Sequence, residues 1–179
     1  MIAIIIVGLF VIAVVLGSMY AIRGQRLAIA GIDDLAAHTR PIDLQAFQNL
    51  IDPHEQQFLR TNLPLAQYRT VQRQRSLAAA QYVRNLAHNA QVLMYLGQAA
   101  RHSTDAKIAG AAEALIEGAV RLRMLAFLGL VKLYIQAAVP DAPFIVSDVF
   151  ERYRMLRETA FLLTRLERPA YAGRVAALL

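Results

Sequence analysis

The sequence predicts an all-α protein in which a single N-terminal transmembrane helix is followed by a cytoplasmic three-helix bundle. Residues 2–22 form an uninterrupted apolar stretch, and three long segments after it have the three-four spacing of amphipathic helices. No segment alternates between apolar and polar residues as a half-buried strand does. Because 57% of the chain is apolar, an intrinsically disordered protein is excluded. We divide the chain into an anchor (1–22), a connector of short helices (23–63) and a helical bundle domain (64–179).

The anchor is predicted from its length and its lack of charge. Residues 2–22 contain no charged side chain, and at ~1.5 Å per residue a helix of this length spans about 31 Å. The hydrocarbon core of a bilayer is ~30 Å thick. The alternative is a cleaved signal peptide, which would have a basic residue before an apolar core of about 7–15 residues. The stretch has neither feature, so we expect a permanent anchor.

The orientation of the anchor follows from its basic flanks. Arg23, Arg26 and Arg40 follow the apolar stretch, whereas no Lys or Arg precedes it. The positive-inside rule therefore places the N-terminus outside and the C-terminal domain in the cytoplasm, as a single-pass protein of the inner membrane. The chain has no cysteine, which fits a reducing compartment and excludes disulfides, thiolate metal sites and cysteine catalysis.

Small residues recur every four positions within the anchor, at Ala13, Gly17 and Ala21. Such a stripe would let another membrane helix approach closely. The alternative is that glycine and alanine are simply common in membrane helices. No histidine or charged residue lies in the span, so we expect it to pack against other helices and not to bind a pigment, a haem or an ion.

The bundle is predicted from three segments bounded by prolines and capping residues. They extend from Pro64 to about His102, from Asp105 to Val139, and from Ser147 to about Arg168. Short links between consecutive helices favour an up-down-up arrangement. In the connector, Asp52-Pro53 is a good helix start, because Asp52 can cap and proline fits the first helical position.

The apolar stripes of the first and third long helices predict the core. In the first helix they comprise Tyr68, Val71, Ala79, Tyr82, Leu86, Ala90, Leu93, Gly97 and Ala100, and in the third Val149, Tyr153, Leu156, Ala160, Leu163 and Leu166. In the second helix Ala106, Gly110, Ala114 and Gly118 lie four apart, which predicts close backbone contact with a neighbour. Residues 124–139 are nearly all apolar apart from Lys132. We expect them to form a buried central helix, with a membrane-lying or partner-facing segment as the alternative.

Charge is concentrated on the first long helix. Residues 64–103 contain five arginines and no acidic residue, a net charge of +5. On a helical wheel Arg69, Arg73, Arg84 and Arg101 fall within about 100° of one another, and we predict that they form a basic interaction face. Anionic lipid, an acidic protein surface and plain solvent all stay open as its surroundings. Nucleic acid is disfavoured as a partner, because there is no recognition motif.

Two further features of this helix carry predictions. Arg75 projects onto the apolar stripe, where we expect its stem to lie on apolar surface and its head to reach water. The alternative is a buried ion pair with Glu113 or Glu117. Asn85 and Asn89 share one face with His88 beside them, which suits a polar contact surface.

The search for chemistry predicts no catalytic, metal or cofactor site. The four histidines have no metal-ligand spacing, Glu113 and Glu117 lack the histidines of a di-metal bundle, and no phosphate-binding or nucleophile motif is present. We therefore expect a non-enzyme: an accessory or structural subunit of a larger membrane complex, with integral membrane proteins as partners. A photosynthetic reaction-centre complex is the specific hypothesis. The alternative is a membrane-tethered adaptor whose basic helix binds anionic lipid or an acidic protein.

Overall fold

The computed structural model describes residues 35, 37–141, 147–173 and 175, and within them every regular element is helical. The helices are α3 (Leu44–Ile51), α4 (Pro53–Asn62), α5 (Leu65–Ala100), α6 (Ala106–Ala138), α7 (Ser147–Glu167) and the 3-10 helix η1 (Pro169–Tyr171). The predicted span 2–22, with Ala13, Gly17 and Ala21, lies outside the described residues. Among the helices that are described, none combines the length and apolarity needed to cross a membrane.

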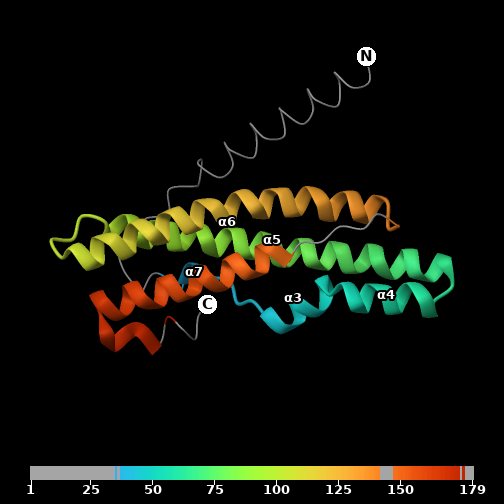
Figure 1. Cartoon of the computed structure of the whole chain (residues 1–179), viewed down its shortest axis with the longest axis horizontal. Coiled ribbons are helices and arrows are strands. Elements are labelled where there is room, and N and C mark those ends of the chain that lie inside the picture. Colours follow the sequence, from blue (N-terminus) through green and yellow to red (C-terminus); the bar gives the residue numbers. More distant parts are fainter. Residues whose placement is uncertain (1–34, 36, 142–146, 174, 176–179) are drawn as a thin grey trace, which may run out of the picture.

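The two longest helices, α5 and α6, form an antiparallel hairpin along the whole length of the molecule (Figure 1). Helix α7 runs antiparallel to α6 and packs against the half of the hairpin that holds the α5–α6 turn. Helices α3 and α4 lie against the other half of the hairpin, end to end with α7. The prediction of an all-α bundle is confirmed, and its three long helices lie where the sequence places them.

The helix boundaries are set by local capping. The Asp52 carboxylate accepts a hydrogen bond of 2.9 Å from the backbone N–H of His54, and Pro53 is the first residue of α4. The Asp105 carboxylate accepts one of 2.8 Å from the N–H of Lys107 at the start of α6. These bonds satisfy N–H groups that have no partner inside the helix, so the predicted boundaries hold to within about two residues.

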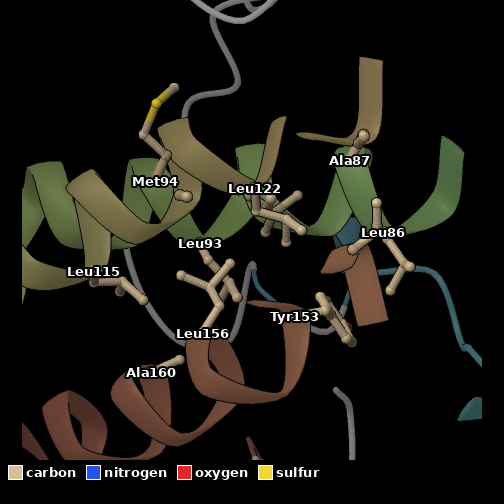
Figure 2. Packing of buried hydrophobic residues seen from close by; sticks show 14 of the residues in the cluster. Leu86, Ala87, Leu93, Met94, Leu115, Leu122, Tyr153, Leu156 and Ala160 are labelled. Carbon is tan, nitrogen blue, oxygen red and sulfur yellow. The ribbon is translucent and has the colours of Figure 1, made fainter. Parts of the chain in front are cut away.

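Leucine and tyrosine side chains from all three long helices meet at the centre of the bundle (Figure 2). Leu86 and Leu93 of α5, Leu115 and Leu122 of α6, and Tyr153 and Leu156 of α7 are almost fully buried. Most of the predicted core stripe is buried, while Val71 and Tyr82 are partly exposed. Leu166 was expected in the core and is 39% exposed. Repeated steps of three residues carry it about 140° around the helix from Tyr153, onto the solvent side.

The predicted small-residue contact of the second helix is wrong for most of its members. Gly110, Ala106 and Ala114 are exposed, and a Cβ atom added to Gly110 would meet no atom within 4 Å. Only at Gly118 is a neighbour close, since a Cβ added there would lie 3.1 Å from a Leu156 methyl group. The close helix contact lies at Gly97 of α5 instead.

A polar joint fixes the start of the described chain to the middle of α5. The buried Asn89 amide receives a hydrogen bond of 2.9 Å from the backbone N–H of Arg40 and donates one of 2.8 Å to its carbonyl oxygen. The same amide donates to the Tyr153 hydroxyl at 3.2 Å, and the His88 ring donates to the His38 carbonyl at 2.8 Å. The polar surface predicted around Asn89 is therefore covered by this chain's own residues 38–40.

Candidate interaction surfaces

The candidate sites of the described bundle are surfaces. Its described residues contain no cluster of three or more histidine, aspartate or glutamate side chains that would hold a metal ion. Glu113 and Glu117 are both exposed, and Glu117 pairs with Arg121 one helical turn away. Exposed i,i+4 pairs of this kind contribute little to stability, so this pair is a solvated feature of the surface.

The four predicted basic residues are all exposed, but the structure distributes them over both ends of the hairpin. Arg69 forms a 2.7 Å ion pair with Asp141 just beyond α6. The Arg84 guanidinium lies 5.5 Å from the centre of the Tyr134 ring and donates a hydrogen bond to its hydroxyl. Arg73 lies on α5 between these two. Arg101 follows the end of α5, about 42 Å along the helix axis from Arg73.

Large apolar side chains cover the outer face of the second half of α6. We call this set the α6 surface: Leu128, Val131, Tyr134, Ile135 and Val139, which are 37% to 54% exposed. The opposite side of the same helix turns Ala126, Gly129, Leu133 and Ala137 into the bundle. The segment 124–139 is therefore not the fully buried helix that we expected. A contiguous group of exposed large apolar side chains marks an interaction site, because on the surface of a soluble protein such residues are ordinarily scattered singly.

No described helix covers the α6 surface. Helices α3, α4 and α7 lie on the other side of the α5–α6 hairpin (Figure 1). Three basic residues accompany this surface, and we call them the basic rim. Arg84 contacts Tyr134, Arg73 lies about three turns earlier on the same side of α5, and Lys132 is exposed on α6. Among the residues that the structure describes, Arg73 and Lys132 take part in no ion pair, whereas Arg69 is neutralised by Asp141.

A second apolar surface lies on α7. Met155, Leu162 and Leu166, which we call the α7 stripe, are 39% to 51% exposed. The stripe adjoins a groove of about 150 Å³ between α6 and α7, lined by Ala114, Glu117, Gly118, Arg121, Arg152, Met155, Leu156 and Thr159. Charges of both signs surround it, including the Glu151–Arg154 ion pair of 3.5 Å. This mixture distinguishes the α7 stripe from the α6 surface, whose border is basic.

Comparison of the chain with protein-family models, with curated proteins and with solved structures finds no match. The functional interpretation therefore depends on the chemistry of the two surfaces and on the predicted anchor.

Arg75 has a structural role that the sequence did not indicate. Its side chain is only 14% exposed, and it donates hydrogen bonds of 2.9 and 3.2 Å to the carbonyl oxygens of Asn49 and Leu50. These are the last carbonyls of α3, which have no N–H partner within the helix and carry the negative end of its dipole. The head of Arg75 thus lies at the end of α3, 3.9 Å from the Glu55 carboxylate, and not beside Glu113 or Glu117. A wide recess of about 520 Å³ opens next to it.

Sequence reasoning missed several polar groups inside the bundle. Arg123 is 2% exposed, and the Ser76 hydroxyl lies 3.2 Å from the buried Gln136 side chain. A cavity of about 10 Å³ borders Ser76, Gln136 and Gln72, a size that holds a single water molecule. No spacing in the sequence distinguishes these residues from exposed polar ones, because the neighbours that bury them come from distant parts of the chain.

Proposed function

We propose that the chain is a non-catalytic, membrane-tethered subunit that helps to hold a larger membrane protein complex together. The observation that carries the proposal is the exposed α7 stripe beside the groove between α6 and α7. A half-apolar groove with charges of both signs fits an amphipathic helix or a loop of another protein. Apolar groups remain exposed in a well-packed bundle when a partner covers them in the assembled complex.

The predicted anchor makes a modest docking surface sufficient. Residues 23–34 join the predicted span to the fully buried Leu35, and a chain of that length reaches at most about 43 Å. The bundle would therefore stay close to the membrane that holds its partners. Tethering raises the local concentration of a binding surface to about millimolar, so weak contacts of the α7 stripe would be occupied most of the time.

The complex that we test first is a photosynthetic reaction-centre complex, because energy-transducing assemblies often contain small single-span subunits. In this hypothesis the subunit is structural, since its predicted span contains no histidine that would ligate a pigment. Purification of pigment-bearing complexes in mild detergent tests it: the chain should be present in constant proportion to the pigment. If the chain is missing from the pigmented fractions but present in another membrane complex, this hypothesis is wrong and the structural role stands.

The structural role itself is tested by site-specific photo-crosslinking in native membranes. A photoreactive amino acid at position 162 of the full chain should crosslink to an integral membrane protein, whereas the same group at the exposed Gln74 of α5 should not. Met155→Asp should remove the crosslink and lower the recovery of the chain with the complex. A matched charge at Gln74→Asp should leave both unchanged. If position 162 crosslinks to no protein and Met155→Asp has no effect on recovery, the α7 stripe is not a docking site.

A membrane-tethered adaptor that binds by charge is the second candidate, and the basic rim of the α6 surface is the observation that favours it. Salt distinguishes the two candidates, because exposed charges are largely screened beyond about 3 Å at 1 M salt. A structural subunit stays with its complex in high salt and mild detergent, whereas an electrostatic adaptor is released from its partner.

A further inference from the structure

We infer that the α6 surface lies on the anionic leaflet of the membrane in which residues 2–22 are anchored, so that the bundle rests on lipid along the second half of α6. The inference rests on the proposed function in one respect, the membrane tether. It adds a second contact with the bilayer and leaves the α7 stripe free for protein.

The arrangement of side chains on α6 is that of an interfacial helix. Such helices turn large apolar residues into the boundary between headgroups and acyl chains, and carry basic residues beside them. On the second half of α6, Leu128, Val131, Tyr134 and Ile135 are exposed, and the exposed Lys132 lies among them. Tyr134 lies within the surface, and tyrosine is enriched at the level of the lipid headgroups.

Charge complementarity favours anionic lipid over other occupants. The basic rim of Arg73, Arg84 and Lys132 borders the surface, and the one described acid nearby, Asp141, is paired with Arg69. The acids of α6 itself, Glu113 and Glu117, precede Leu128 by about 17 Å or more along the helix. That distance exceeds the ~10 Å Debye length at 0.1 M salt. The cytoplasmic leaflet carries negative charge, which attracts a basic border of this kind.

The tether also places the α6 surface within reach of the bilayer. The polar joint at Asn89 holds the start of the described chain to the middle of α5, and residues 23–34 reach at most about 43 Å from Leu35. Arg84, which contacts Tyr134, is only about 8 Å along α5 from Asn89. At the level of Arg84, the α6 surface therefore lies within the reach of a chain of this length.

The absence of cysteine from the chain allows a direct test by single-site labelling. Full-length Ile135→Cys, labelled with an environment-sensitive fluorophore, is reconstituted into vesicles of phosphatidylcholine with phosphatidylglycerol. Lipid-borne quenchers should quench this label. The matched control is Leu162→Cys on the α7 stripe, because Leu162 and Ile135 are 50% and 46% exposed, and its label should stay unquenched. In vesicles of phosphatidylcholine alone, quenching at position 135 should fall.

The basic rim is tested by two double variants that remove the same charge. Each basic residue near an anionic surface favours its membrane contact about fivefold. Arg73→Gln with Lys132→Gln should therefore lower the ratio of quenched to unquenched label at position 135 about 25-fold. Arg101→Gln with Lys107→Gln removes two charges at the far end of the hairpin and should change that ratio less than about twofold.

Any result that differs from the quenching expected at positions 135 and 162, or from the expected effects of the two double variants, overturns the inference. Equal quenching at positions 135 and 162 in anionic vesicles would show that the α6 surface has no preference for lipid. A label at 135 that is shielded from a water-soluble quencher but unaffected by the lipid quencher would show that residues 2–22 or a second copy of the chain covers it. A chain that an alkaline wash strips from the vesicles would refute the tether, and the proposed function with it. A chain that is retained but unquenched refutes only this inference.

Discussion

Gly97 lies at a tight contact between α5 and α6, and adding a single methyl group there tests the packing of the bundle. A Cβ at position 97 would lie 2.9 Å from the Ala112 carbonyl oxygen and 2.9 Å from a side-chain carbon of Ile116. The carbonyl belongs to the backbone of α6, so the two helices must separate to admit the methyl group. Gly97→Ala should therefore carry the overpacking cost of about 1–3 kcal/mol.

The opposing term is helix propensity, because replacing glycine by alanine inside a helix stabilises it by about 1 kcal/mol. Gly97→Ala is therefore expected to be neutral or to destabilise by up to about 2 kcal/mol. Gly110→Ala is the matched control. A Cβ there meets nothing within 4 Å, so the variant should show only the stabilisation of about 1 kcal/mol.

The assay is thermal unfolding of the full chain in mild detergent, followed by circular dichroism. One kcal/mol shifts the Tm of a domain of 150–250 residues by about 2–4 °C. Gly110→Ala should thus melt about 2–4 °C above the parent chain, and Gly97→Ala at or below it. If Gly97→Ala stabilises as much as Gly110→Ala, the two helices are not in contact at this position.

Three other predictions concern the core and the polar joint. Leu86→Ala and Leu156→Ala should each lower the free energy of unfolding by ~2–5 kcal/mol in denaturant titrations, and an unchanged midpoint would remove that residue from the core. Asn89→Ala leaves the backbone of Arg40 without its partner, a cost of about 1–3 kcal/mol. It should speed amide hydrogen exchange at residue 40 while exchange in α6 stays slow, and unchanged exchange at residue 40 would refute the joint. Burial raises the pKa of Tyr153 above its ordinary value of 10.0, against the lowering effects of the Asn89 hydrogen bond and the Arg157 charge. The folded state then holds the phenol proton more tightly, so the stability due to this group is complete below pH 10 and is lost as the pH rises; an equally steep loss in Tyr153→Phe would contradict this.

The ends of the helices were predictable because their causes are local. Asp52 and Asp105 cap the helices that follow them through hydrogen bonds to residues two positions away. Prolines and short polar links interrupt the amphipathic pattern at the same places. A boundary that depends on neighbours in the sequence can be read from the sequence alone.

The direction that each side chain faces was less predictable, because it depends on neighbours that are distant in the sequence. Gly118 and Gly110 belong to one stripe of the sequence, yet only Gly118 has a helix opposite it. Leu166 continues the three-four spacing of α7, but its position around the helix places it on the solvent side of the core. Neither the periodicity nor the composition of residues 124–139 predicts which of their apolar side chains are exposed. Both measures count large and small apolar residues alike.

The roles of the polar residues followed from their surroundings in the fold. The sequence suggests a polar contact surface at Asn89, but this residue is buried, and its partner, the backbone of Arg40, lies 49 residues earlier. Arg75 was identified as unusual because it projects onto an apolar stripe, yet the helix end that binds it is 25 residues away. Of the predicted basic face, Arg69, Arg73 and Arg84 lie beside α6, whereas Arg101 lies at the other end of the hairpin.

The central claim, that residues 2–22 hold the bundle at a membrane, is tested most directly by alkaline extraction of native membranes. An alkaline wash strips proteins that are held by charge or by peripheral contact and leaves integral membrane proteins in place. The full chain should remain in the membrane pellet, and a variant that lacks residues 2–22 should appear in the wash. If the full chain is extracted as completely as the truncated one, the apolar stretch is not a membrane anchor and the account fails.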